Sequence, residues 1–202
     1  MTSVNDIKNV CVFCGSSKGN IPVYLEAARE FSEKLVSVEL VSFTEVVLLV
    51  SIMGAVATTA IEKGGRVVGI IPEAMVKGFG GALPGETIIV NDMHTRKSMF
   101  VERSDAFIAL PGGIGTFEEI LECLTWSQLS IHSKPIVILN TNGFYDALKM
   151  LLDRAVQDGF MSQQNRELAT FVETPAEAVD ALFTYQLPAG RFALKWERPN
   201  SI

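Results

Sequence analysis

The sequence predicts an α/β fold, a doubly wound parallel sheet with helices on both of its faces. Short apolar runs of strand length recur along the chain, and stretches with helical spacing of apolar residues separate them. The strand candidates are apolar throughout, whereas a strand with one wet face alternates apolar and polar residues. Both faces of the sheet should therefore be covered.

The expected elements follow from this pattern and from the residues that end each run. Gly64 and Gly65 end one helix, and the tail after Pro188 has no regular periodicity. The expected strands are 9–14, 66–72, 106–110 and 135–139, and the expected helices are 23–36, 52–63, 116–129, 144–158 and 175–185. We expect a single domain over residues 1–202, with an irregular tail at about 188–202.

Composition and charge exclude several classes of protein. The chain has 202 residues, of which 48% are hydrophobic, and its net charge is −6. An acidic protein is a poor binder of nucleic acid, which requires many Lys and Arg side chains, whereas a small anion needs only a local positive site. The start of the chain lacks a secretory signal, and the most apolar stretch, 36–60, is interrupted by Glu39 and Glu45. These features predict a cytoplasmic protein that neither binds nucleic acid nor spans a membrane.

The three cysteines do not suggest a disulfide framework, because their number is odd. Cys11 and Cys14 have the spacing of a redox pair, but they lie in a strand pattern rather than at the start of a helix. Burial of these side chains is the favoured interpretation, and redox chemistry is the alternative.

A glycine-rich loop between the strand at 106–110 and the helix at 116–129 is a candidate anion site. Gly112, Gly113 and Gly115 allow close approach and positive φ, and the following helix start provides unpaired N–H groups. Thr116 is placed to cap the helix or to bind a phosphate oxygen. A tight turn is the alternative interpretation.

Charged residues flank this loop in the sequence. Glu118 and Glu119 are expected in the first helical turn, where a carboxylate either stabilises the helix start or acts on a ligand. Residues 93–97 (MHTRK) bring Arg96 and Lys97 together, either to bind a phosphate or ribose or as a solvated basic turn.

Residues 93–97 followed by 111–119 (PGGIGTFEE) resemble the paired signature of the Lonely Guy family, the cytokinin riboside 5′-monophosphate phosphoribohydrolases. The resemblance extends from residues 10–17 through 125–129 to 158–160 and so covers most of the chain. It implies a Rossmann-like fold, a homodimer, and hydrolysis of an N6-modified adenosine 5′-monophosphate to the free base (a cytokinin) and ribose 5-phosphate without a cofactor or metal. It also implies that Arg96 and Glu119 are catalytic. The expected substrate-binding residues are Ser16, Lys97, Gly112, Gly113, Ile114, Gly115, Thr116, Glu118 and Thr125.

Two other functions remain open from the sequence. One is a nucleotide-binding or sensing protein without catalysis, and the other is a defective gene product. Retention of both Arg96 and Glu119 favours the enzyme, because a pure binding module has less need of a carboxylate beside an anionic ligand.

One segment departs from the family pattern. The family carries a second glycine-rich loop, L-V-Y-G-G-G-S-V-G-L-M-G, where this chain has residues 40–51 (LVSFTEVVLLVS) before Met53 and Gly54. An apolar strand without that loop removes backbone donors for a phosphate and places branched side chains where the ligand needs close approach. The altered segment therefore predicts very low activity for this chain.

Codons for residues 43–51 exist that encode the family loop in a second frame. TTT ACG GAG GTG GTT CTG TTG GTC TCN encodes the residues present, and reading from the third base gives Y-G-G-G-S-V-G-L. We infer that the segment is the family loop read in a shifted frame. The transcript should contain these overlapping codons. A coding sequence without them would contradict the inference.

Overall fold

The computed structural model describes residues 7–38, 41–44, 51–79 and 85–196. These residues form a seven-stranded sheet in the order β4-β3-β2-β1-β5-β6-β7, and all neighbouring strands are parallel. The strands are β1 (Asn9–Phe13), β2 (Val41–Thr44), β3 (Val67–Pro72), β4 (Glu86–Val90), β5 (Ala106–Ala109), β6 (Ile136–Leu139) and β7 (Thr170–Val172). The predicted parallel sheet is confirmed.

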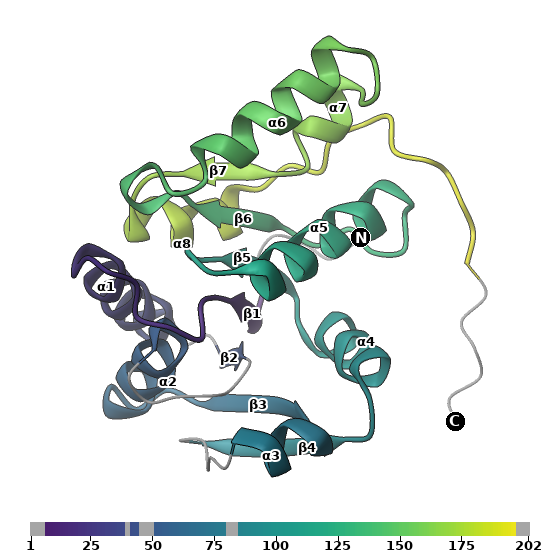
Figure 1. Cartoon of the computed structure of the whole chain (residues 1–202). Helices are drawn as coiled ribbons and strands as arrows, with labels where there is room; N and C mark the ends of the chain where they lie inside the picture. The colour runs from purple at the N-terminus through teal and green to yellow at the C-terminus, as the bar shows by residue number, and fades with distance from the viewer. Residues whose placement is uncertain (1–6, 39–40, 45–50, 80–84, 197–202) are drawn as a thin grey trace.

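Helices cover both faces of this sheet. Figure 1 shows α1 and α2 on one side of the sheet and α4 and α5 on the other. The helices are α1 (Val23–Ser37), α2 (Ile52–Glu62), α3 (Glu73–Phe79), α4 (Met93–Arg103), α5 (Ile114–Gln128), α6 (Asp146–Gln157), α7 (Gln163–Arg166) and α8 (Pro175–Thr184), with a 3-10 turn, η2 (Thr141–Gly143). Within the described ranges, none of these helices has both the length and the apolar character that crossing a bilayer requires.

Alternate side chains of each central strand enter two separate cores. Val10 and Val12 of β1 pack in the core with α1, α2 and α8, whereas Cys11 and Phe13 pack in the core with α4, α5 and α6. The neighbouring strands β5 and β6 divide their side chains in the same way. Because both faces are buried, every fully buried position of these strands is apolar, which explains the apolar runs in the sequence.

The structure also contains elements that the sequence pattern did not reveal, namely α3, β4, α4, α7 and β7. Strand β4 is an edge strand with exposed Glu86, Thr87 and Ile89, and its apolar run spans only residues 88–90. Residues 93–97 are not a basic turn but the start of α4, where Asp92 caps the helix by accepting a hydrogen bond from the Thr95 N–H at 2.8 Å. The interpretation as a solvated turn is wrong because this cap and the packing of Phe100 fix a helix there.

The order of the strands changes direction between β1 and β5. From β1 the chain builds outward to β4, and from β5 it builds in the opposite direction to β7. In such sheets, ligands bind at the carboxyl ends of the strands beside this switch point. The two loops that leave β1 and β5 meet there, with Gly15 N donating to Pro111 O at 3.0 Å.

The irregular tail packs on its own chain as far as residue 196. The Phe192 N–H donates to Gln128 O at 3.0 Å, and Trp196 Nε1 donates to Leu129 O at 2.8 Å. Arg191 donates to the carbonyl oxygens of Ser127 and His132. These contacts satisfy carbonyl groups at the end of α5, where a cation also interacts favourably with the helix dipole.

Candidate active site

The loop after β5 depends on glycine for space. A Cβ atom on Gly112 would lie 2.2 Å from Thr116 Oγ1 and 2.9 Å from Gly15 N, so no larger residue fits. A Cβ on Gly113 or Gly115 would meet nothing within 4 Å, which leaves that side of the loop open. Of the two properties that glycine permits, positive φ is not used here, since none of these three glycines belongs to the positive-φ residues of the described chain. Close approach, and not left-handed backbone, is what the loop requires.

Helix α5 begins at Ile114, two residues before the expected start, with Gly113 at its N-cap and no side-chain cap. Ile114 and Gly115 are therefore helical, and the N–H groups of the first turn point to the carboxyl edge of the sheet. Glu118 and Glu119 lie beyond the first turn, contrary to expectation. The helix dipole acts mainly within that turn, so stabilisation of the helix start does not explain these carboxylates.

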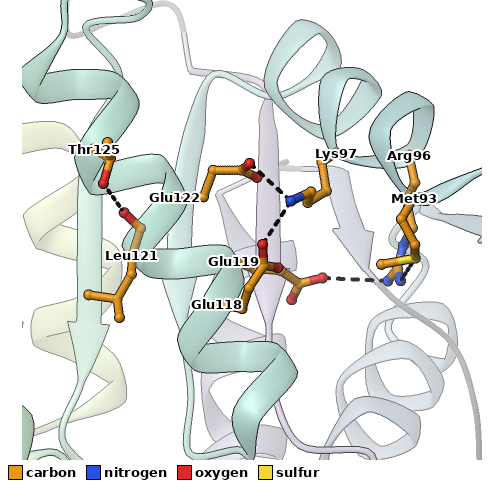
Figure 2. Close-up of polar contacts among 8 residues, drawn as sticks. All are labelled: Met93, Arg96, Lys97, Glu118, Glu119, Leu121, Glu122 and Thr125. Carbon is orange, nitrogen blue, oxygen red and sulfur yellow. Dashed lines mark hydrogen bonds and ion pairs between the residues drawn. The ribbon is translucent and has the colours of Figure 1, made fainter.

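Arg96 of α4 and Glu119 of α5 form a buried pair. Their side chains are 1% and 3% exposed, and Arg96 Nη2 lies 3.7 Å from Glu119 Oε1 (Figure 2). This distance brings two charges together without a hydrogen bond. The sulfur atoms of Met75 and Met93 contact Arg96 Nη1, and the guanidinium lies over the Phe100 ring. Glu119 Oε2 is buried and accepts no hydrogen bond from the described residues.

Burial shifts the pKa values of both groups. Burial raises the pKa of Glu119 to about 7, although the positive charge of Arg96 opposes this shift. Burial likewise lowers the pKa of Arg96, and the charge of Glu119 opposes that change. A carboxyl group with this pKa can exchange a proton near neutral pH, as general acid–base catalysis requires.

Lys97 donates hydrogen bonds to two carboxylates. Its Nζ lies 2.7 Å from Glu118 Oε1 and 3.0 Å from Glu122 Oε1 (Figure 2). The hydrogen bond that Lys97 donates to Glu118 is the largest influence on the pKa of Lys97 and raises it. The structure therefore places Lys97 between two helices beside the Arg96–Glu119 pair.

Ser16 and Thr125, the remaining expected binding residues, differ in position. Ser16 is exposed in the loop after β1, next to Gly15, which contacts Pro111 and Gly112. Thr125 lies further along α5, well away from Arg96 in Figure 2, and its hydroxyl donates to Leu121 O at 2.8 Å. The structure thus brings Ser16, but not Thr125, to the glycine loop.

The start of α2 also faces this region, but its N–H groups have partners within the protein. Ile52 N donates to Ser17 O and Met53 N to Gly15 O, each at 3.3 Å, while Gly54 N donates to Ser51 Oγ at 2.9 Å. Only Val41–Thr44 of the altered segment is described as strand, and residues 45–50 lie outside the described residues. The prediction that this segment lacks the glycine-rich family loop therefore concerns residues outside the described part of the chain.

Some residues of this region had no signal in the sequence. Glu122 reaches Lys97 only because α4 and α5 lie side by side, and Met75 reaches Arg96 from α3, which was not predicted. Tyr145 donates to Leu110 O at 2.7 Å beneath the glycine loop.

A cavity of about 310 Å³ lies between α1 and α2, away from the Arg96–Glu119 pair, and its lining includes Arg29, Ser51 and Thr58. In the described residues, no cluster of His, Cys, Asp and Glu side chains has the arrangement of a metal site.

Gly112→Ala should lower the free energy of unfolding by about 1–3 kcal/mol, because its Cβ would collide with Thr116 and the backbone of Gly15. Gly113→Ala is the matched control, since its Cβ meets open space. Urea denaturation measures both variants. Equal stability of the two would contradict the predicted close approach.

Stability should fall as pH rises from about 4.5 to 7, because the folded protein holds the Glu119 proton more tightly than the unfolded chain does. The shift corresponds to at most about 3 kcal/mol. Glu119→Gln should remove this part of the pH dependence in thermal melts, whereas Glu118→Gln, at an exposed position, should retain it. The same pH dependence in wild type and Glu119→Gln would exclude a raised pKa.

Comparisons with solved structures place the fold among known proteins. The molybdenum cofactor carrier protein of Chlamydomonas reinhardtii superposes with a TM-score of 0.65 at 17% identity, covering 89% of this chain and 99% of that chain. The protein TM1055 superposes with a TM-score of 0.65 at 21% identity, covering 89% and 100%. At these identities the likeness concerns the fold alone, and it confirms the Rossmann-like architecture.

Comparisons of sequence identify the family. The protein family described as "Possible lysine decarboxylase" matches residues 53–182, starting directly after the altered segment. A probable cytokinin riboside 5′-monophosphate phosphoribohydrolase of Oryza sativa subsp. japonica is 44% identical over 179 residues, covering 87% of this chain and 79% of that protein. A cytokinin riboside 5′-monophosphate phosphoribohydrolase of Arabidopsis thaliana is 42% identical over 195 residues, covering 94% and 89%. With the paired motifs, the buried Arg96–Glu119 pair and this similarity along its length, the chain belongs to the Lonely Guy family.

Proposed function

We propose that this protein hydrolyses the N-glycosidic bond of an N6-modified adenosine 5′-monophosphate, releasing the free base and ribose 5-phosphate. The observation that most supports this proposal is the buried pair of Arg96 and Glu119 beside an open glycine loop at the switch point of the sheet. The names of the curated relatives supply the substrate class.

The phosphate group would bind at the start of α5. The N–H groups of Gly113, Ile114, Gly115 and Thr116 lie at a helix N-terminus without a side-chain cap, which favours an anion. The open space beside Gly113 and Gly115 allows oxygen atoms to approach. Gly112 preserves the shape of this loop, and Ser16 would contribute from the neighbouring loop.

The scissile bond would then lie beside Glu119. Thr116 and Glu119 are both buried and three residues apart, so they share one face of α5 about 4.5 Å apart along its axis. A nucleotide that binds its phosphate near Thr116 therefore brings its ribose toward the carboxyl group. Arg96, on the other side of that carboxyl group, would bind ribose or phosphate oxygens.

In the proposed reaction the bond between C1′ and the base nitrogen breaks, and its electron pair stays with the nitrogen. Water oxygen bonds to C1′, and the Glu119 carboxylate accepts a proton from that water. The departing base takes a proton from solvent, and Glu119 then returns its own proton to solvent, so that one water is consumed. The carboxylate also stabilises positive charge that develops on the ribose. Arg96 orients the substrate and holds Glu119 in its ionised form as the reaction begins.

A nucleotide sensor without catalysis is the second candidate. Two observations favour it: residues 40–51 lack the glycines of the family loop, and N–H groups at the start of α2 are bound within the protein. Both features reduce the donors available to a phosphate. The roles of Glu118 and Thr125, the single-domain organisation, the homodimer and the cytoplasmic location stay predictions.

The chain as given should release base very slowly from a panel of nucleoside monophosphates, including isopentenyladenosine monophosphate. A version carrying the restored glycine loop should turn over at ordinary enzymatic rates of about 1 s⁻¹ or more. Chromatography of the released base measures both. Equal inactivity of the two forms would sink the glycosidase proposal, and full activity of the chain as given would refute the effect of the altered segment.

In the active form, Glu119→Gln should abolish turnover and leave nucleotide affinity largely intact. Gly78→Ala is a matched control, because that position has open space and lies outside the proposed site. Turnover that persists in Glu119→Gln would remove the carboxylate from the mechanism.

A further inference from the structure

A second charged contact joins α4 to α5 beside the Arg96–Glu119 pair. Lys97 follows Arg96 on α4, and its ammonium group lies between Glu118 and Glu122 of α5 (Figure 2). Lys97 is 16% exposed, Glu122 24% and Glu118 49%. The contact between Lys97 and Glu122 is thus the better shielded of the two, and solvent and salt weaken it less.

The two contacts differ in how closely the groups approach. Lys97 Nζ makes hydrogen bonds of 2.7 and 3.0 Å, whereas Arg96 and Glu119 remain 3.7 Å apart. Burial of Arg96 and Glu119 disfavours their charged forms, so the attraction within this inner pair contributes little to holding the two helices together. The shorter outer contact is better suited to hold them together.

Lys97 also has little capacity left for a phosphate. Its side chain is largely buried, and two carboxylates already surround its ammonium group. A phosphate ligand at Lys97 would have to approach two negative charges and displace at least one of them. The geometry therefore favours a contact between helices over a contact with the substrate.

We propose that Lys97 and Glu122 are positioning residues whose ion pair holds α4 against α5 so that Arg96 and Glu119 face the substrate together. This inference rests on the proposed function for its catalytic meaning. The structural part of the proposal, that the ion pair fixes the distance between α4 and α5, can be tested on a protein that does not turn over substrate.

The first test measures binding of adenosine 5′-monophosphate to the full chain by calorimetry. Lys97→Met and Glu122→Gln break the same ion pair, so they should raise the dissociation constant to the same extent, within about twofold of each other. A loss of affinity in Lys97→Met at least tenfold larger than that in Glu122→Gln would make Lys97 a phosphate ligand and overturn the proposal.

The second test follows the titration of Glu119 by carbon-13 NMR in the full chain. The charge of Glu122 raises the pKa of Glu119, so Glu122→Gln would lower that pKa if only charge mattered. If the pair holds the helices, its loss moves Arg96 and Lys97 away from Glu119, and the pKa should instead rise by about half a pH unit or more. A fall in the pKa would contradict the proposal.

Two further variants control this titration. Lys97→Arg keeps the charge and donors and should preserve the wild-type pKa of Glu119. Glu102→Gln makes the same chemical change at an exposed position of α4 outside the cluster and should leave the titration unaltered. A change in Glu102→Gln as large as that in Glu122→Gln would show that the effect does not come from the Lys97–Glu122 pair.

Kinetics then separate this inference from the proposed function. In the form that turns over, Lys97→Met and Glu122→Gln should each lower kcat about tenfold and change KM by the same factor, and the double variant should be no worse than the more severe single variant. Additive effects would refute a shared role. If neither form turns over while the titration responds as expected, the proposed function fails and the positioning inference stands.

Discussion

Parallel pairing of β1 with β5 at the centre of the sheet sets the position of the functional elements. The chain winds outward in opposite directions from these two strands, so their loops have no neighbouring helix between them and meet at the carboxyl edge. Gly112 makes that meeting possible, because any Cβ there would occupy space taken by Thr116 and Gly15. This contact between the two loops fixes the position of the start of α5 and therefore of Glu119.

The buried pair of Arg96 and Glu119 is costly for the fold. Neither group is solvated, and their separation of 3.7 Å leaves them without a direct hydrogen bond. Removing charged groups from water costs several kcal/mol each, and attraction at this distance offsets that cost only in part. Surrounding contacts hold the pair in place: Met75, Met93 and Phe100 enclose Arg96, and Lys97 joins the same two helices. Active sites typically contain buried ionisable groups that lower the stability of the fold and have pKa values suited to proton exchange.

The region around the switch point is asymmetric. On one side, α5 begins at Ile114 after the N-cap residue Gly113, which offers no side-chain cap, and the first turn faces open space. On the other side, α2 begins at Ile52 after the N-cap residue Ser51, whose hydroxyl caps the helix, while the next N–H groups contact the loop after β1. The glycine-free residues 40–51 precede that second helix start. The family motif at 111–119 is therefore retained beside one helix start, whereas the family loop before the other helix start is replaced.

The sequence by itself determined the parallel character of the sheet, its central strands, five of the flanking helices (α1, α2, α5, α6 and α8) and the family. Residues 106–110 and 135–139 could be assigned because a strand covered on both faces is apolar at every position, and 111–119 because close backbone approach requires glycine. Edge strand β4 escaped prediction since its exposed positions are polar or mixed, and α4 since its start is rich in charge. Only the tertiary structure decided that Arg96 is buried, that Glu119 titrates near neutral pH, and that Lys97 meets Glu122. These properties depend on how α4 and α5 lie against each other, and residues far apart in sequence carry no local pattern that records such a contact.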